Sequence, residues 1–358
     1  MESRQKKKEL IEIVSPLLGW YERQARCLPW REEPSAYRVW ISEIMLQQTR
    51  VEAVKPYFER FLKELPTIKA LAEAGEEQLL KLWEGLGYYN RVRNLQKAAQ
   101  TIVKEYDGEI PMDYEKLLSL SGIGPYTAGA IASIAFDLPY AAVGGNVLRI
   151  ITRLTSDDQD ISLAKVKKDI SKTVTEILPD SGAGSFNQAL MELGATVCIP
   201  NGKPLCDKCP LKSYCSAYAE NRVLDFPVKA PKKARRIEHR MVFFIACGKE
   251  IAIRKRPAKG LLSGLWELPN TEKTKDEISI FQQLLDWNII DGSVMPLGKS
   301  KHIFTHIEWQ MQGYYVVVQE KGKAEGFVWV DDAEIRKQYA LPSAFQYFYE
   351  CGIKHLKE

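Results

Sequence analysis

The stretch Leu117–Ala130 reads LLSLSGIGPYTAGA, and it decides how the first half of the chain folds. Gly-Ile-Gly separates two helical patterns, which predicts a tight turn because glycine lets the backbone bend and approach a partner closely. Pro125 suits the first turn of the second helix. Backbone amides at such a turn point outward and can bind a phosphate. The stretch therefore predicts a helical hairpin, which is either an ordinary connection or a contact with nucleic acid.

Four of the seven cysteines lie close together further along the chain, at Cys198, Cys206, Cys209 and Cys215, separated by seven, two and five residues. This crowding indicates a metal site, a disulfide knot or chance. The charged start MESRQKKKEL lacks the apolar core of a signal peptide, so we expect a reducing compartment, where disulfides are disfavoured. Iron–sulfur and zinc both suit four thiolates. Zinc ribbons usually show two CxxC pairs and this chain has one, which favours a [4Fe–4S] cluster.

Length and composition leave room for two domains and no membrane span. The 358 residues are 45% hydrophobic and 27% charged, as in ordinary globular proteins. There is no apolar run of about eighteen residues, which a spanning helix requires. The net charge of +4 is compatible with a nucleic-acid partner without indicating one. The basic stretch 229–240, KAPKKARRIEHR, is interpreted as a linker that also contacts phosphates.

The residue pattern changes across this basic stretch. Before it, apolar residues recur at helical spacing, as in Ala36–Phe61 and Glu76–Tyr106. After it, short β-rich runs predominate, with two helical candidates among them. The sequence therefore predicts an all-α N-terminal domain and a small α+β C-terminal domain. The predicted strands are Met241–Cys247, Ile251–Arg254, Gly313–Gln319 and Phe327–Val330, and the predicted helices are Lys275–Leu285 and Ser343–Cys351.

The complete string LxxLxGIGxxTA resembles the helix-hairpin-helix of the DNA glycosylase superfamily. Three further strings resemble the MutY family of adenine DNA glycosylases: WISEIMLQQTRVE at 40–52, WEGLGYYNRVRNL at 83–95 and FNQALMELGATVC at 186–198. The resemblance covers about residues 10–225, and the remainder resembles the extra domain of that family. It implies a helical glycosylase domain at 1–225, with the hairpin near 115–135 and an iron–sulfur loop at 198–215. A basic linker at 226–240 and a Nudix-like lesion-recognition domain at 241–358 complete it.

The resemblance also implies a cofactor and a partner. Members of the family carry a [4Fe–4S] cluster, which Cys198, Cys206, Cys209 and Cys215 would hold. The first gap, 199–205, is one residue longer here than in the family, within a loop rich in Pro and Gly. The implied partner is double-stranded DNA containing adenine opposite 8-oxoguanine or guanine. We expect a monomer in the cytoplasm, associated with the nucleoid if the source is bacterial.

The catalytic residues that the resemblance implies are Glu43, Tyr126 and Asn146. Breaking an N-glycosidic bond requires protonation of the leaving base, and Glu43 would protonate adenine. Its apolar surroundings, VWISEIML, predict a raised pKa that keeps it protonated. Tyr126 stands where glycosylases with lyase activity place a lysine, and it cannot form a Schiff base. A monofunctional enzyme is therefore expected.

The second catalytic carboxylate of the family is missing. The family motif VDGN supplies an aspartate that stabilises the sugar cation, but residues 143–146 read VGGN, with Gly144 at the aspartate position. The nearest acidic residues are Asp137 and Asp157, and nothing in the sequence indicates that either substitutes. We expect DNA binding to survive and base excision to be severely reduced. A non-catalytic mismatch-binding protein on the same fold is the alternative.

Further contacts are implied residue by residue. A glycosylase extrudes its target base, so bulky and amide side chains must occupy the gap in the duplex. The implied DNA-binding residues are Gln48, Thr49, Leu86, Tyr88, Gly122, Gly124, Phe304, Thr305 and His306. The implied adenine pocket consists of Arg26, Leu28, Trp30 and Gln188. Packing within the core or a loop is the alternative interpretation of each.

The C-terminal domain contains GLLSGLWELP at 260–269, which resembles the opening of a Nudix box. An active Nudix hydrolase needs a glutamate-rich helix downstream to hold Mg²⁺, and TEKTKDEISIFQQLLDWN lacks that pattern. We therefore expect a Nudix-like fold without pyrophosphatase activity. The family reads 8-oxoguanine through a Phe-Ser-His turn, and this chain has Phe304, Thr305 and His306. The added methyl group of Thr305 is expected to alter the lesion preference in degree.

Overall fold

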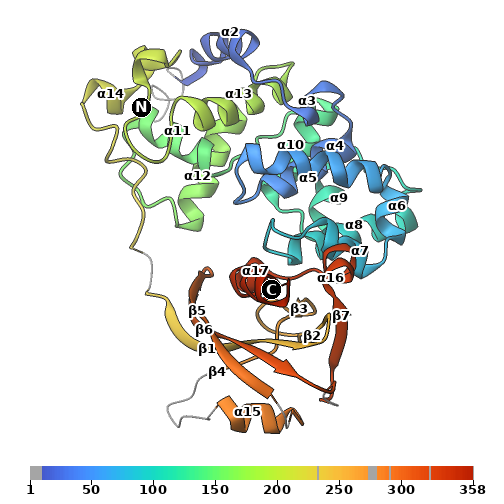
Figure 1. Ribbon diagram of the computed structural model, residues 1–358. Helices are drawn as coiled ribbons and strands as arrows, with labels where there is room; N and C mark the ends of the chain where they lie inside the picture. Colours follow the sequence, from blue (N-terminus) through green and yellow to red (C-terminus); the bar gives the residue numbers. More distant parts are fainter. Residues whose placement is uncertain (1–9, 232–233, 273–279, 290–291, 322–323, 358) are drawn as a thin grey trace. The chain divides into compact units, whose positions relative to one another are not determined.

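The computed structural model describes residues 10–231, 234–272, 280–289, 292–321 and 324–357. They divide into two compact units (Figure 1). The N-terminal unit consists of residues 1–73 and 93–231, and the C-terminal unit consists of residues 74–92 and 232–358. The N-terminal segment 1–9, two lysines of the basic stretch (Lys232 and Lys233) and residues 275–279 of one predicted helix lie outside the described residues.

The N-terminal unit is helical. Its helices are α2 (Val14–Gln24), α3 (Pro29–Glu32), α4 (Ala36–Leu46), α5 (Val51–Glu64), α6 (Ile68–Glu73), most of α8 (Asn90–Glu105), α9 (Tyr114–Ser119), α10 (Pro125–Phe136), α11 (Gly145–Thr155), α12 (Ala164–Glu176), α13 (Ala183–Thr196) and α14 (Ser216–Ala219). Two short 3₁₀ helices, η1 (Cys206–Lys208) and η2 (Lys212–Tyr214), lie among the cysteines.

Helices α9 and α10 form the hairpin that the sequence predicted. The side chain of Asp113 caps α9 by accepting a hydrogen bond from the Lys116 amide at 2.8 Å. Gly122 in the turn has φ +78°, and a Cβ there would lie 2.7 Å from the Cβ of Asn94, so both backbone and space require glycine. Helix α10 begins at Pro125.

Helix α10 is the central helix of the unit. Its residues Thr127–Ser133 are all buried, and it packs against α4 and α13. Close packing with α13 depends on Gly184, because an added Cβ would lie 2.5 Å from the Ser133 carbonyl oxygen and 2.9 Å from the Ile134 Cα. These are backbone atoms of α10, so the two helices could not remain this close with a larger residue.

Two long helical predictions are interrupted in the structure. The segment Ala36–Phe61 is split between α4 and α5, because Gln48 adopts a left-handed backbone conformation with φ +61°. The segment Glu76–Tyr106 is likewise split into α7 (Glu76–Leu82) and α8 by Gly85, Gly87 and Tyr88, all with positive φ. Apolar spacing continues through both breaks, so periodicity alone did not reveal them.

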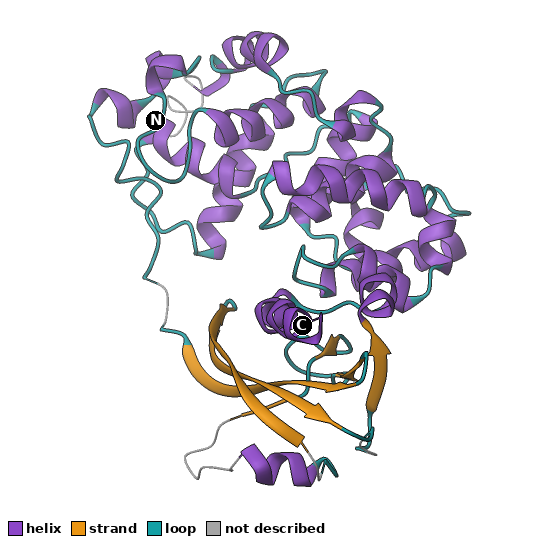
Figure 2. Ribbon diagram, in the orientation of Figure 1, coloured by secondary structure: helices purple, strands orange, loops and turns teal. Residues whose placement is uncertain are grey.

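The C-terminal unit is built on a mixed sheet (Figure 2). Its strands are β1 (Arg236–Cys247), β2 (Glu250–Lys255), β3 (Trp266–Glu267), β4 (Asn270–Glu272), β5 (Gly292–Ile303), β6 (Ile307–Val318) and β7 (Phe327–Asp331). The order is β3-β2-β1-β6-β5, with β4 on β1 and β7 on β2. Strands β1 and β6 are parallel, and the other pairs are antiparallel. The helices are α7, α15 (Ile280–Asp286), α16 (Asp332–Gln338) and α17 (Ser343–Lys357).

Each face of this sheet carries a separate core. Alternate residues of β1 point to opposite faces, so Phe244 packs with α16 and α17 while Phe243 packs with α15. The all-α plus α+β prediction is therefore confirmed, but several elements differ. Strands β1 and β6 start at Arg236 and Ile307, five and six residues before the predicted Met241 and Gly313, because their pairing extends through a polar segment. Strands β3, β4 and β5 and helix α16 were not predicted.

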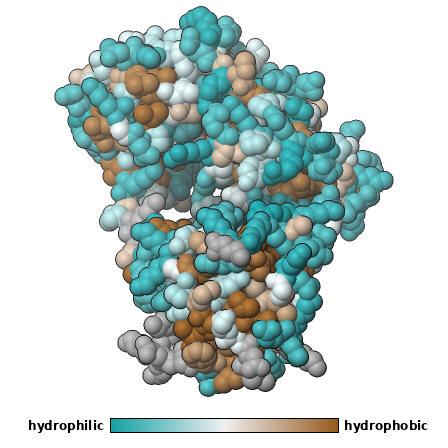
Figure 3. Space-filling view, in the orientation of Figure 1, coloured by the Kyte–Doolittle hydropathy of each residue, from teal (hydrophilic) through white to brown (hydrophobic). Residues whose placement is uncertain are grey.

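The described residues include no helix that is long and apolar enough to cross a bilayer. On the face shown in Figure 3, hydrophilic side chains predominate and the hydrophobic ones form separate patches.

The packing of α13 against α10 yields a stability prediction. We expect Gly184→Ala to lower the free energy of unfolding by about 1–3 kcal/mol, since the new methyl group overpacks against backbone. The matched control is Gly145→Ala, at an exposed helical position where an added Cβ meets nothing within 4 Å. Urea denaturation of both variants measures the difference, and equal midpoints would contradict the packing argument.

Candidate active site

One large pocket in the N-terminal unit gathers most of the predicted site residues. Its walls come from α3, α4, α10, α11 and α13, and from the loop before α5. Among the predicted residues it brings together Arg26, Leu28, Trp30, Glu43, Gln48, Thr49, Tyr126, Asn146 and Gln188. Gly122 and Gly124 lie instead on the hairpin turn. Leu86, Tyr88 and Phe304–His306 belong to the C-terminal unit.

Glu43 is a buried acid on α4. It is 6% exposed, and the Tyr126 hydroxyl donates a hydrogen bond to its Oε2 at 2.6 Å. Burial raises the pKa of Glu43, although the hydrogen bond from Tyr126 and the charge of Arg31 partly oppose the shift. Burial and the nearby Glu43 also raise the pKa of Tyr126 well above its usual value. Burial, and not the hydrogen bond from Tyr126, therefore favours a protonated Glu43, as a general acid requires.

Gly144 lies directly beside this pair. It caps the N-terminus of α11 with extended backbone, and an added Cβ would lie 2.9 Å from Cε2 and 3.1 Å from Cδ2 of Tyr126. Position 144 thus faces the Tyr126 ring, and glycine offers no carboxylate there. The two acidic residues nearest in sequence are engaged elsewhere: Asp137 accepts from the Gly182 amide at 3.0 Å, and Asp157 accepts from the Gln159 amide at 3.0 Å.

Asn146 is held by a buried arginine on the next turn of α11. Arg149 donates to Asn146 Oδ1 at 2.8 Å, to the Gly194 carbonyl at 2.8 Å and to the Cys198 carbonyl at 2.8 Å. Burial lowers the pKa of Arg149, which is nonetheless surrounded by acceptors. This side chain joins the start of α11, the end of α13 and the first cysteine.

Sequence reasoning missed Glu192 and Arg31, which also line the pocket. Glu192 on α13 is 1% exposed and accepts hydrogen bonds from Arg26 and Arg31. A signal was available, because Glu192 interrupts an apolar helical stretch (FNQALMEL) just as Glu43 does. Its arginine partners could not be inferred, since they lie more than 160 residues away in the chain.

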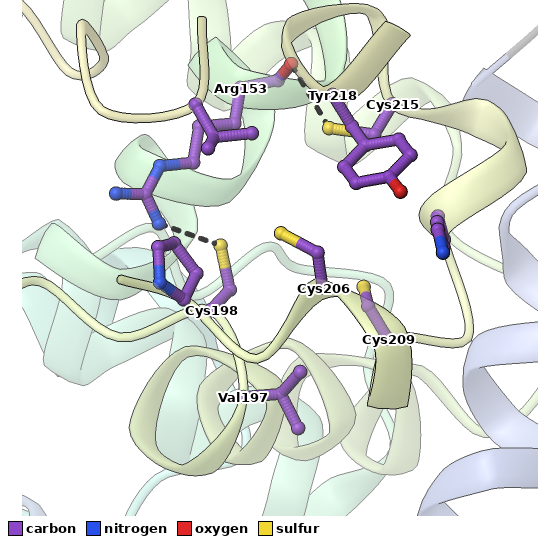
Figure 4. Close-up of a pocket in the computed structure, with 10 residues that line it drawn as sticks. Arg153, Val197, Cys198, Cys206, Cys209, Cys215 and Tyr218 are labelled. Carbon is purple, nitrogen blue, oxygen red and sulfur yellow. Dashed lines mark hydrogen bonds between the residues drawn. The ribbon is translucent and has the colours of Figure 1, made fainter. Parts of the chain in front are cut away.

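The four clustered cysteines line a second, smaller pocket, and their sulfur atoms face a common space (Figure 4). Arg153 donates to Cys198 Sγ at 3.2 Å, and the Cys215 thiol donates to the Arg153 carbonyl at 3.4 Å. Burial raises the pKa of the Cys209 thiol to about 12. All seven cysteines of the chain are free thiols. The disulfide-knot interpretation is therefore not what the structure shows.

The remaining predicted residues form a separate group in the C-terminal unit. Tyr88 is 49% exposed, and its hydroxyl lies 3.5 Å from Oγ1 of the exposed Thr305. Leu86 is only 7% exposed, so in this structure it packs inward. The ring of Phe304 packs edge-on against Trp309 and His302, whereas His306 is exposed.

Comparisons with known proteins agree with this geometry. Residues 41–176 match the HhH-GPD superfamily of base excision DNA repair proteins, and residues 241–350 match a NUDIX domain. The adenine DNA glycosylase of Rattus norvegicus is 33% identical, covering 99% of this chain and 83% of that protein. The one from Homo sapiens is 35% identical, covering 87% and 68%. A solved thermostable thymine-DNA glycosylase is 26% identical and covers 62% of this chain and all of that one, with a TM-score of 0.55.

The fold and the pocket thus define a helix-hairpin-helix protein of base excision DNA repair with a Nudix-like C-terminal domain. Sequence identity of this level over nearly the whole chain identifies the family as well as the fold. The chain belongs to the adenine DNA glycosylase family, which confirms the resemblance inferred from its motifs.

The contact between Tyr126 and Glu43 yields a prediction. Tyr126→Phe removes a donor that favours the carboxylate, so we expect the pKa of Glu43 to rise further. The infrared carbonyl band of the protonated acid, assigned by its loss in Glu43→Gln, reports the titration. Tyr114→Phe is the control, because Tyr114 stacks on Tyr140 and does not line the pocket. An unchanged or lowered pKa in Tyr126→Phe would show that the hydrogen bond is unimportant.

Proposed function

We propose that this chain binds duplex DNA in which adenine stands opposite 8-oxoguanine or guanine, and that it excises the adenine very slowly. The observation that carries the proposal is Gly144 against the ring of Tyr126, in a pocket that otherwise retains the acid Glu43. The relatives named adenine DNA glycosylase support the substrate class. We expect a monofunctional glycosidase, because Tyr126 offers no amine for a Schiff base.

The reaction would break the bond between adenine N9 and the sugar C1′. The bonding electrons leave with the base, which takes a proton from Glu43, and the sugar becomes an oxocarbenium-like cation. Water then adds to C1′ and returns a proton to the Glu43 carboxylate, leaving an abasic site and free adenine. Glu43 supplies the proton and Tyr126 orients its carboxyl group. The cation at C1′ needs a nearby anion, which Gly144 does not supply.

We expect the missing carboxylate to lower the excision rate more than the remaining pocket residues can compensate. Each tenfold loss in rate corresponds to about 1.4 kcal/mol of transition-state stabilisation, and a preorganised charge commonly supplies several such factors. Glu192 is an anion in the same pocket, but two arginines already neutralise it. The same observation favours the second candidate function, a mismatch-binding protein that does not cleave.

The group of DNA contacts is proposed on structural grounds as well as by resemblance. Gln48 has a strained left-handed backbone at the pocket rim, which suits a side chain that enters a duplex. The adjacent Thr49, the hairpin glycines and the exposed Tyr88 would also contact DNA, whereas Leu86 is buried and is kept as an expectation from the resemblance alone. The exposed Thr305 and His306 would read the opposite base. We keep the predicted domain boundaries, a monomeric state and a cytoplasmic location as expectations.

We also propose a [4Fe–4S] cluster bound by Cys198, Cys206, Cys209 and Cys215. A cluster spreads its four thiolates over four irons, which suits cysteines that surround a common pocket. When bound, it would cross-link the 198–215 loop.

The cluster proposal predicts a coloured protein. We expect the purified chain to be brown, with a broad visible absorption band, and to contain four irons per chain by elemental analysis. Cys206→Ser should lose colour and iron, whereas Cys351→Ser, far from the group in sequence, should keep both. A colourless chain containing zinc would contradict the proposal.

Position 144 yields the main functional prediction. We expect Gly144→Asp to raise the single-turnover rate on an adenine:8-oxoguanine duplex by about 10²-fold or more, because it restores an anion beside the sugar cation. The new Cβ would lie 2.9 Å from Cε2 of Tyr126, so the ring must move aside in any variant that adds a side chain at position 144.

Gly144→Ala and Gly144→Asn are the matched controls. Alanine adds the same Cβ without a charge, and asparagine adds an isosteric neutral amide. Both should bind the duplex and remain slow. Recovery in the alanine or asparagine variant would show that the charge at position 144 is not the missing element.

A further inference from the structure

The adenine pocket contains a second buried carboxylate, Glu192, whose surroundings are the reverse of those of Glu43. The two oxygens of Glu192 accept from Arg26 Nε at 2.5 Å, from Arg26 Nη2 at 3.1 Å and from Arg31 Nη2 at 2.9 Å. The side chain is 1% exposed and belongs to α13. Glu192 is therefore fully used as an acceptor and cannot move without releasing two arginines.

Arg31 is fixed on three sides. Glu192 accepts from one of its terminal nitrogens, the Arg26 carbonyl accepts from the other at 3.2 Å, and the guanidinium lies over the Tyr21 ring at 5.5 Å. Its side chain is only 16% exposed. The three ionic groups sum to one net positive charge, two arginines against one carboxylate. Arg31 belongs to α3. The next helix in the chain is α4, which contains Glu43.

The pKa values of the two carboxylates of the pocket are displaced in opposite directions. Burial alone would raise the pKa of Glu192, but the hydrogen bonds and charges of Arg26 and Arg31 prevail and lower it. The pKa of Glu43 is raised by burial and lowered in part by Arg31. The other ionisable groups that line the pocket are Tyr126, on α10, and the exposed Arg50 and Glu52, at the start of α5.

The proposed reaction places a specific demand on this arrangement. When Glu43 gives its proton to the departing base, it becomes a carboxylate in a buried site, which is costly without a positive partner. Arg31 is the cation whose field reaches Glu43. A flexible, solvated arginine would be a poor partner, because it would have to be ordered in the transition state. Arg31 is already ordered by Glu192.

We propose that Glu192 is a positioning residue of the glycosylase site: it clamps Arg26 and Arg31 so that one net positive charge stabilises the carboxylate that Glu43 becomes after protonating adenine. This inference rests on the proposed function of the same pocket. It gives a role to a residue that acts on neither the base nor the sugar in the proposed reaction, and it explains why an acid is buried beside two arginines.

The first test needs no turnover and uses the full chain. The pH titration of Glu43 is followed by the infrared carbonyl band that disappears in Glu43→Gln. Arg31→Gln should raise the titration midpoint, because the cation favours the carboxylate. Glu192→Gln should shift the midpoint by at least about half a pH unit when Arg31 is present and by less than the experimental error when Arg31 is already Gln. Glu192→Asp keeps the carboxylate on a side chain that is one methylene shorter. It should shift the Glu43 midpoint less than Glu192→Gln does.

A merely structural role for Glu192 would not show this dependence on Arg31. The proposal is overturned if Glu192→Gln leaves the midpoint unchanged, or shifts it equally in both backgrounds. If Glu192→Gln does not fold, the same comparison is made with Glu192→Asp. Glu220→Gln is the control: Glu220 pairs with Arg222 at an exposed site, and its loss should leave the midpoint unchanged.

The second test separates this inference from the proposed function. In the Gly144→Asp chain, Glu192→Gln should lower the single-turnover rate at least tenfold, while affinity for a duplex with an abasic-site analogue opposite 8-oxoguanine stays within about twofold. If Gly144→Asp does not cleave, the proposed function fails, and the titration still decides the role of Glu192. If Gly144→Asp cleaves and Glu192→Gln cleaves equally well, the positioning role is wrong.

Discussion

The packing of α4 against α10 is the constraint on which the rest of the site depends. It buries Glu43 and places the Tyr126 hydroxyl 2.6 Å from its carboxyl group. Helix α10 can lie this close to its neighbours because its buried residues are mostly small and because α13 meets it with a glycine. A looser contact would admit water, and Glu43 would then ionise as an ordinary surface glutamate does. Backbone packing thus supplies the burial that raises the pKa of the acid.

The two buried carboxylates of the pocket, Glu43 and Glu192, have different electrostatic surroundings. Burial raises the pKa of Glu43, whereas Arg26 and Arg31 lower the pKa of Glu192, so the two pKa values are displaced in opposite directions. A third carboxylate would complete the set expected of the family at position 144. Its replacement by glycine removes a charge without removing support from the fold, since Gly144 is a helix cap with extended backbone. We therefore expect fold and base-excision chemistry to be separable in this chain.

Much of this arrangement could be predicted from the sequence, for identifiable reasons. The hairpin, the four cysteines and the pocket residues around Glu43 are encoded in contiguous strings, so local pattern and family resemblance sufficed. Strand β5 could not be found this way, because Pro296 and Gly298 interrupt it and its alternation is polar. Glu192 contacts Arg31 and Arg26, which lie 161 and 166 positions before it in the chain. No local sequence pattern reveals contacts over such separations.

The central claim is that this chain keeps its lesion-binding pocket while lacking the anion that base excision requires. The most direct measurement is a single-turnover assay of the unaltered chain on an adenine:8-oxoguanine duplex, with bound and cleaved DNA scored in the same samples. Our account predicts that the duplex is bound with its adenine still attached. Release of adenine at the rate of a family member that has the aspartate would contradict it, and would mean that another group stabilises the sugar cation.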